Sequence, residues 1–269
     1  MKQLFLAITL ISALVLTSCE GDKVNIFTLQ QDVEMGEEVV NQILSDSINY
    51  PILNRTTNKA AYDYLNKIKM KLLNSGKIKY AEEFAWNTYI IDQDVMNAFA
   101  VPGGTTFYYT GLLKYLDNEA SLAGVMAHEF AHADKRHSTT ILTKKYGYQT
   151  LLGMFVGEDG GMAITIASEL AQGLGNLKFS RDNEYEADEW AVKYLSETDY
   201  DPRGVAYFFE KMEAGEAAHK SDPDWLVYFK THPNEDDRIE KIYEHHKSLG
   251  SKKGEKFEDE YAAFKKLLP

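Results

Sequence analysis

The sequence predicts an α+β fold that is mainly helical, with one small β-sheet or hairpin beside a central helix. Apolar residues recur at helical spacing through most of the chain, whereas β-branched and aromatic residues concentrate between positions 84 and 110. No segment repeats itself along the 269 residues. We therefore expect a single folded domain, spanning residues 26–269.

The N-terminus has the pattern of a secretory signal. A positive charge precedes an apolar run at residues 4–16, which is too short to cross a bilayer comfortably. The run ends in "LTSC", which resembles the lipobox of bacterial lipoproteins, whose cysteine becomes the acylated first residue of the mature chain. We expect a signal peptide at residues 1–18, a lipidated tether at residues 19–25 and a membrane anchor at Cys19. An uncleaved apolar tail is the alternative.

Composition narrows the class of protein. The hydrophobic content of 44% is that of a globular chain, and Cys19 is the only cysteine, so no internal disulfide can form. The formal net charge is −12, and no basic stripe is present that could replace the counterions along a phosphate backbone. Nucleic acid is therefore not expected as a partner.

Helices are expected along the chain both before and after the segment that forms the sheet. The first two occupy residues 33–44 and 57–73, and the cluster Asn74-Ser75-Gly76 ends the second. A long helix begins at an N-cap provided by Asp117 or Asn118. Further helices are expected at residues 179–197, 203–213, 236–247 and 256–268.

The sheet is predicted from two runs, "WNTYII" and "TTFYYT", which bracket "NAFAVPGG". Pro102-Gly103-Gly104 is typical of a turn, so "FAVPGGTTFYY" is expected to form a hairpin or a strand-loop-strand unit. Residues 147–175 are apolar and rich in glycine, but "GEDGG" interrupts them, so they cannot span a membrane as one helix. We expect a mobile helical hairpin or lid there.

The segment "AHEFAHADKRH" carries the residues of a metal site. On a helix, His128 and His132 are four positions apart and point the same way, and Glu129 lies beside them within reach of a metal-bound water. His137 is nine residues after His128, about half a turn out of phase, and should face away. A chance occurrence of the motif on a solvated helix is the alternative interpretation.

Two protein ligands are too few for a catalytic zinc ion, which usually takes three. In "SRDNEYEAD", Glu184 and Asp188 share one helical face, while Glu186 points elsewhere. Glu184 can be the third ligand, and Asp188 can accept the second ring N–H of a ligand histidine. The alternative is an acidic, solvated helix, which fits Glu186 and Glu189 well.

Together these motifs resemble a family of zinc metallopeptidases that includes the membrane protease HtpX, the CAAX prenyl proteases, the mitochondrial Oma protease and bacterial periplasmic lipoprotein proteases. The segments that carry the resemblance are "NAFAVPGG", "TGLL", "HEFAH", "SRDNEYEAD" and "THPNEDDR", which cover about half of the chain. The resemblance implies a zincin-like domain of the gluzincin type. It also implies one Zn²⁺ per chain.

The resemblance assigns roles residue by residue. It implies that His128, His132 and Glu184 bind zinc, that Glu129 is the general base and that Asp188 supports a ligand histidine. His232 matches a family position near the metal, where it either donates to the developing oxyanion or occupies the fourth zinc position and keeps the enzyme latent. A surface loop histidine is the third possibility.

Two further implications concern Arg238 and the substrate. Arg238 is expected to position the loop of His232 or the helix of Glu184. An extended substrate is expected to add itself as a strand along the cleft. The residues expected to contact it are Asn97, Ala98, Phe99, Ala100, Val101, Pro102, Gly103 and Gly104.

The expected activity is zinc-dependent endoproteolysis of unfolded or misfolded cell-envelope proteins. Because the chain lacks the additional membrane helices of HtpX and the prenyl proteases, a prenylated substrate is not expected. The closest resemblance is to short lipoprotein members, which suggests the periplasmic face of the outer membrane of a Gram-negative bacterium. The competing hypothesis is a binding or chaperone module with a latent or structural zinc site.

Overall fold

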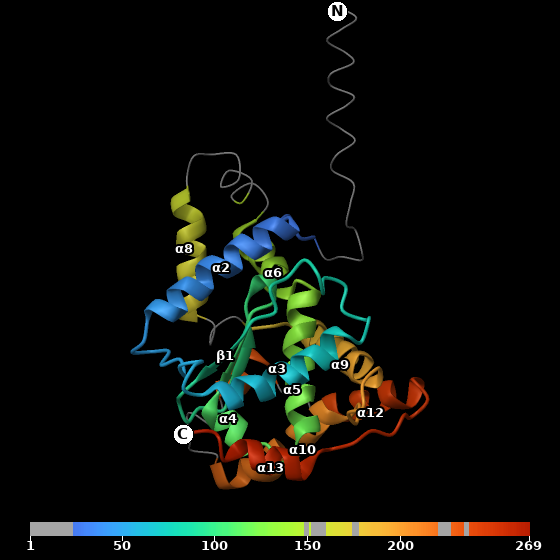
Figure 1. The fold of residues 1–269 in the computed structure, drawn as a ribbon. Coiled ribbons are helices and arrows are strands. Elements are labelled where there is room, and N and C mark those ends of the chain that lie inside the picture. Colours follow the sequence, from blue (N-terminus) through green and yellow to red (C-terminus); the bar gives the residue numbers. More distant parts are fainter. Residues whose placement is uncertain (1–23, 148–150, 152–159, 174–177, 220–226, 234–236) are drawn as a thin grey trace, which may run out of the picture.

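The computed structural model describes residues 24–147, 151, 160–173, 178–219, 227–233 and 237–269 (Figure 1). In these residues the chain is mainly helical with one three-stranded sheet, which confirms the predicted fold class. The elements are α2 (Leu29–Ser45), α3 (Lys59–Leu73), β1 (Thr88–Ile91), β2 (Ala98–Ala100), the 3₁₀ turn η1 (Pro102–Gly104), β3 (Thr106–Tyr109), α4 (Thr110–Tyr115), α5 (Glu119–Asp134), α6 (His137–Tyr146), α8 (Gly160–Gly173), α9 (Arg181–Ser196), α10 (Gly204–His219), α11 (Val227–Thr231), α12 (Arg238–Ser248) and α13 (Glu258–Lys265).

Helix α5 runs through the middle of the fold (Figure 1). It begins where the sequence predicts, because the side chain of Asn118 accepts a hydrogen bond of 2.9 Å from the backbone N–H of Ser121. Every residue from Glu119 to Asp134 is buried, which is why its sequence lacks a polar face. A helix surrounded on all sides by protein can hold polar side chains away from water.

Helices α9 and α10 pack directly on α5. The contact with α10 depends on two glycines, since a Cβ at Gly124 would lie 2.1 Å from the backbone nitrogen of Val205 and one at Gly204 would lie 2.0 Å from the carbonyl oxygen of Ala120. This close approach holds the C-terminal half of the domain against the helix that carries the HExxH motif.

The sheet has the strand order β1-β3-β2. Strands β2 and β3 are antiparallel and joined by η1, which confirms the predicted hairpin, with Phe99 opposite Phe107. Strand β1 pairs in parallel with β3, with Thr88 opposite Thr106. This order leaves β2 at an edge of the sheet, and β2 also contacts α5.

Helix α2 packs on η1, the turn between β2 and β3. A Cβ at Gly36 would lie 1.9 Å from the carbonyl oxygen of Pro102, so glycine is needed where α2 crosses η1. Buried Asp32 of α2 also pairs with Arg136, a residue held in the left-handed conformation at φ 57° between α5 and α6. This ion pair attaches α2 to the turn that follows α5.

Among the described residues, three helices were not expected from the sequence, namely α4, α6 and α11. Helix α8 lies in the stretch 147–175 and packs against α2, while the remainder of the expected lid is largely outside the described residues. The predicted signal peptide and Cys19 also lie outside them. Among the described residues, no helix is both long enough and apolar enough to cross a membrane.

Candidate metal centre

Two helices and one loop bring four metal-binding side chains together. Helix α5 provides His128 and His132, helix α9 provides Glu184, and His232 follows directly after α11. All four side chains are buried, and one ligand atom from each lies within 4.8 Å of the others. The four-residue spacing on α5 and the crossing of α9 over it therefore produce the cluster.

The distances between these atoms fit one small cation. The Nε2 atoms of His128 and His132 are 3.0 Å apart, and each lies 3.5 Å from a carboxylate oxygen of Glu184. Two atoms that share a tetrahedral zinc ion at its usual bond lengths are separated by about 3.3 Å. The donor set of imidazole nitrogens and one carboxylate is also a usual one for catalytic zinc.

His232 contributes a fourth atom to the same point. Its Nδ1 lies 3.4 Å from Nε2 of His128 and 3.2 Å from Oε1 of Glu184. The opposite ring nitrogen, Nε2, lies 3.5 Å from Oε1 of Glu129. His232 is thus not a surface residue: its imidazole stands between the ligand cluster and Glu129.

Arg238 and Asp188 support the cluster from behind. The Asp188 carboxylate lies 2.9 Å from Nδ1 of His128, and Arg238 donates to both Asp188 oxygens at 2.8 Å. A third guanidinium nitrogen lies 2.9 Å from Oε2 of Glu184. Since Arg238 is fully buried, this one cation compensates two buried carboxylates and links α12 to α9.

Glu129 is held as an unsatisfied carboxylate beside the cluster. It is 1% exposed, and among the described residues neither oxygen has a hydrogen-bond partner of good geometry. Burial raises the pKa of Glu129, while the nearby histidines His232 and His128 oppose the rise. A buried acid with a raised pKa is suited to accepting and returning a proton near neutral pH.

The electrostatics of the cluster favour a bound cation. Burial lowers the pKa of His128, but Asp188 and Glu184 outweigh this effect and raise it to about 9, so a metal ion must displace a proton from this ring in order to bind. Burial holds the pKa of His132 well below its ordinary value, which keeps the ring neutral as ligation requires. For Glu184 burial acts to raise the pKa, yet His232 and Arg238 bring it well below its ordinary value, so the carboxylate is ionised.

The structure corrects the expectation for His137. Its Nδ1 lies 2.9 Å from Nδ1 of His132, and its Nε2 lies 3.1 Å from Oε2 of Glu186, so neither residue points away from the site. The rotation argument fails because α5 ends at Asp134 and Arg136 turns the chain in the left-handed conformation before α6. Counting residues along an unbroken helix cannot anticipate this turn.

Aromatic rings enclose the histidines and were not predicted. The ring of Phe179 lies 3.9 Å from that of His132, centroid to centroid, and Tyr228 stacks on His232 at 4.5 Å and 20°. Phe179 precedes α9, and Tyr228 lies one helical turn before His232 on α11. Aromatic residues beside candidate ligands are the signal that could have identified both.

The eight residues expected to contact a substrate lie on β2, η1 and the positions beside them, and all are buried. The hydrogen bonds from Tyr109 N to Asn97 O and from Val101 N to Thr105 O bind the odd-numbered residues to β3. In an antiparallel pair the alternate residues then direct their backbone groups away from that partner. The backbone groups of Ala98 and Ala100 therefore face the outer edge of the sheet.

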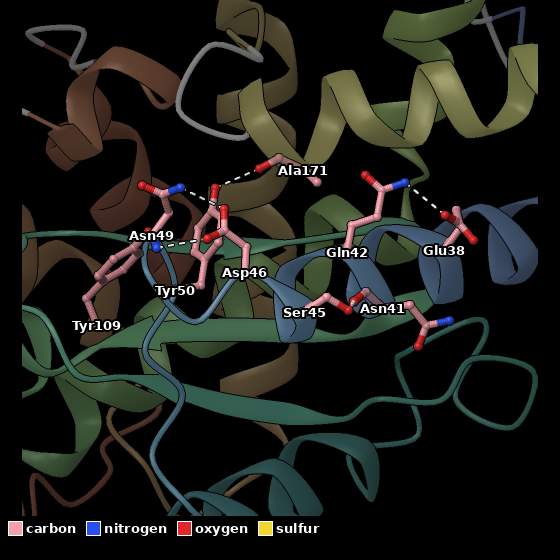
Figure 2. Close-up of a pocket in the computed structure, with 9 residues that line it drawn as sticks. All are labelled: Glu38, Asn41, Gln42, Ser45, Asp46, Asn49, Tyr50, Tyr109 and Ala171. Carbon is pink, nitrogen blue, oxygen red and sulfur yellow. Dashed lines mark hydrogen bonds between the residues drawn. The ribbon is translucent and has the colours of Figure 1, made fainter.

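A separate hollow of about 740 Å³ lies between α2 and the end of α8, and none of its lining residues belongs to the cluster (Figure 2). Its carboxylates are already occupied, since Glu38 accepts a hydrogen bond of 2.8 Å from Gln42 and Asp46 accepts two from Asn49. The Tyr50 hydroxyl donates to the carbonyl oxygen of Ala171. The groups that could perform chemistry are gathered around His128 instead.

A buried set of three histidines and one glutamate, with the Glu129 carboxylate beside it, defines a metal-dependent hydrolase of the metallopeptidase class. Comparison with known proteins agrees, because residues 60–246 match the model of Peptidase family M48. The chain belongs to this family, which confirms the resemblance noted from the motifs. The family is zinc-dependent, and the four-residue group could hold one such ion.

Two kinds of relative are similar to this chain. The "Beta-barrel assembly-enhancing protease" of Escherichia coli (strain K12) is 29% identical over 79% of the chain and 43% of the relative, and the corresponding protein of Yersinia pestis is 29% identical over the same shares. The "Mitochondrial metalloendopeptidase OMA1" of Schizosaccharomyces pombe is 29% identical over 67% of the chain and 52% of the relative. The chain thus spans about half of the length of these relatives.

Proposed function

We propose that this protein is a zinc endopeptidase that hydrolyses peptide bonds of unfolded or misfolded cell-envelope proteins. The observation that carries the proposal is Glu129, a buried and unsatisfied carboxylate beside a cluster suited to one zinc ion. A purely structural zinc site has no need of such a group. The envelope as the place of action is supported by the lipobox-like segment at Cys19 and by the name of the bacterial relatives, "Beta-barrel assembly-enhancing protease".

The reaction assigns a separate task to each residue. His128, His132 and Glu184 would hold the zinc ion, which when bound polarises the scissile carbonyl and acidifies water. Glu129 accepts a proton from the attacking water as the oxygen bonds to the carbonyl carbon, and then delivers that proton to the amine nitrogen as the C–N bond breaks. Asp188, held by Arg238, fixes the ring of His128 so that Nε2 faces the cluster.

The outer edge of β2 is the surface along which we expect the substrate to lie. Strand β2 packs on α5, and the Ala100 amide, which lies near the Glu129 carboxylate, acts to lower the pKa of that residue. A peptide that pairs with the outward backbone groups of Ala98 and Ala100 would therefore pass beside Glu129. Recognition through main-chain hydrogen bonds tolerates many sequences but requires an extended and thus unfolded segment.

The position of His232 supports a latent resting state of the enzyme rather than a role in stabilising the oxyanion. Its Nδ1 lies among the ligand atoms, and four protein ligands close a zinc site that must keep one position open for catalysis. Its Nε2 faces Glu129 and would occupy the position from which that residue acts. We infer that substrate must displace this imidazole before hydrolysis can begin.

Replacing His232 with alanine is expected to raise casein cleavage several-fold while zinc remains bound to the other three ligands. The measurement is the rate of release of peptides from casein, compared with His245→Ala, a histidine of α12 outside the cluster. If His232 instead donated to the oxyanion, its loss would slow cleavage by about 10²–10³. That slower rate would contradict the latent state.

Removal of the metal ion distinguishes the hypothesis of an enzyme from the competing hypothesis of a binding module. Digestion of casein is expected to stop in excess chelator and to return when stoichiometric zinc is restored, because the three ligands hold the only group that polarises the carbonyl. A module that merely holds unfolded chains with a structural zinc ion gives no peptides in either condition. Absence of products from the zinc-loaded protein would therefore refute the proposal.

Anchoring at Cys19 is a separate part of the proposal, because that residue lies outside the described structure. We propose removal of residues 1–18 and acylation of Cys19, which places the tether of residues 19–25 at a membrane surface. The periplasmic face of the outer membrane is the proposed location. The mass of the mature N-terminus tests this, and an unmodified Cys19 or an intact Met1 would exclude the anchor.

A further inference from the structure

Each of the two zinc-binding histidines has a different partner behind it. Nδ1 of His128 faces the Asp188 carboxylate directly, at 2.9 Å. Nδ1 of His132 instead faces a second histidine, His137, at 2.9 Å, and the far nitrogen of that ring lies 3.1 Å from Glu186. The Asp188 carboxylate therefore supports His128 directly, whereas the Glu186 carboxylate supports His132 through the ring of His137.

The three side chains have only one arrangement of protons that satisfies all of them when His132 binds a metal ion. Ligation uses the lone pair of Nε2, so the ring proton of His132 must be on Nδ1, from which it donates to Nδ1 of His137. His137 then carries its own proton on Nε2 and donates it to Glu186. The hydrogen bonds thus run in one direction, from the ligand to the carboxylate.

Because the two imidazoles are buried, loss of a hydrogen bond in this arrangement is energetically unfavourable. His132 and His137 are 1% and 0% exposed, whereas the Glu186 side chain is 26% exposed and lies at the surface of α9. An imidazole N–H that lost its acceptor at this depth would pay the cost of an unmet buried donor. Water could replace Glu186 more easily than it could replace His137.

The turn after α5 explains how His137 reaches this position. Arg136 takes the left-handed conformation, and Asp32 of α2 together with the carbonyl oxygen of Phe27 holds its guanidinium. This contact fixes the start of α6 and points His137, its first residue, back toward α5. The position of the second histidine therefore depends on contacts unrelated to the metal.

We propose that His137 and Glu186 are positioning residues that fix the tautomer and orientation of His132 for zinc binding. The proposal rests on the zinc site of the proposed function. It assigns to these residues the part that Asp188 performs for His128. Outer partners of metal-ligating histidines typically contribute 10–100-fold to metal affinity.

The test is the zinc dissociation constant, measured by competition with a chromophoric chelator. His137→Leu removes the acceptor at nearly constant volume and is expected to weaken zinc binding by about 10–100-fold. His137→Asn places a carbonyl oxygen near the position of Nδ1 and is expected to recover most of that loss, to within about threefold of wild type. Glu186→Gln keeps an acceptor but loses the charge, so its effect should lie between these two.

The matched control is Glu189→Gln, which removes the same charge from α9 at a residue paired only with Lys193 among the ion pairs of the described chain. Its zinc affinity should equal that of wild type. The absorption spectrum of the cobalt-substituted protein provides a second readout, which should change in His137→Leu and not in the control. Thermal unfolding of the metal-free variants separates loss of affinity from loss of fold.

Three results would overturn the proposal. One is zinc binding by His137→Leu as tight as that of the control, and another is equal weakening by His137→Leu and His137→Asn. The third is failure of wild type and control alike to bind zinc, which would refute the zinc site of the proposed function as well. A wild type that binds zinc without cleaving casein would refute only the peptidase activity, because affinity still measures the role of His137.

Discussion

Replacing Glu129 with glutamine is expected to reduce peptide hydrolysis by about 10³-fold or more, toward the upper end of what a general base contributes. Glutamine occupies the same space but cannot accept a proton from water or return one to the leaving amine. Zinc binding should persist, since His128, His132 and Glu184 are unchanged. The measurement is the turnover of casein by zinc-loaded protein, with metal content determined on the same sample.

The stability of this variant provides an independent check. Because burial raises the pKa of Glu129, the folded protein disfavours its charge, so the neutral amide should leave the unfolding midpoint unchanged or higher. Glu189→Gln serves as the control for an equal change of charge at the surface of α9.

Turnover of the Glu129→Gln variant within tenfold of wild type would exclude Glu129 as the base. Envelope proteins that remain bound to the inactive variant in cells would identify the substrate.

Much of this site could be predicted because its essential spacing lies within helices. His128 and His132 are one turn apart on α5, and Glu184 and Asp188 are one turn apart on α9, so the period of the helix places each pair on one face. The predicted N-cap Asn118 precedes α5, whereas α9 was expected from residue 179 and is capped by Ser180 in the structure. Local rules were sufficient wherever the chain continued without a break.

Prediction failed where the chain turns between elements. His137 was expected to face away from the site. The chain is redirected by Arg136, which adopts the left-handed conformation, and an arginine in the sequence gives no indication of that conformation. The parallel pairing of β1 with β3 and the short helix α11 that presents His232 likewise depend on contacts between distant segments. For His232 the sequence left the choice between a latent and an oxyanion role open, and only the distances from its two ring nitrogens favour the first.

Arg238→Met is expected to lower the free energy of unfolding by about 3–5 kcal/mol, the usual effect of leaving buried charges without a partner. The guanidinium is fully buried, donates to both oxygens of Asp188 and lies 2.9 Å from Glu184. Methionine fills much of the same volume beside Phe209, whose ring lies 4.2 Å from the guanidinium carbon, so packing alone should not account for the loss. Urea unfolding in excess chelator measures the effect without a contribution from bound zinc.

Arg203→Met is the matched control for this loss. Arg203 also pairs with an aspartate through two nitrogens, since its Nε and Nη2 atoms donate to Asp201, but its side chain is 33% exposed. Solvent reaches this guanidinium, and the buried Asp201 carboxylate keeps its hydrogen bonds from the Arg203 backbone N–H and the Tyr207 hydroxyl, so loss of the Arg203 side chain should cost only about 1 kcal/mol. The double variant Asp188→Asn/Arg238→Met should recover part of the stability lost in Arg238→Met, because one of the two uncompensated carboxylates is then neutral. Equal losses in Arg238→Met and Arg203→Met, with no recovery in the double variant, would mean that Arg238 acts through packing rather than through charge. Compensation of two carboxylates by one buried cation allows α9 to direct two acidic side chains at α5.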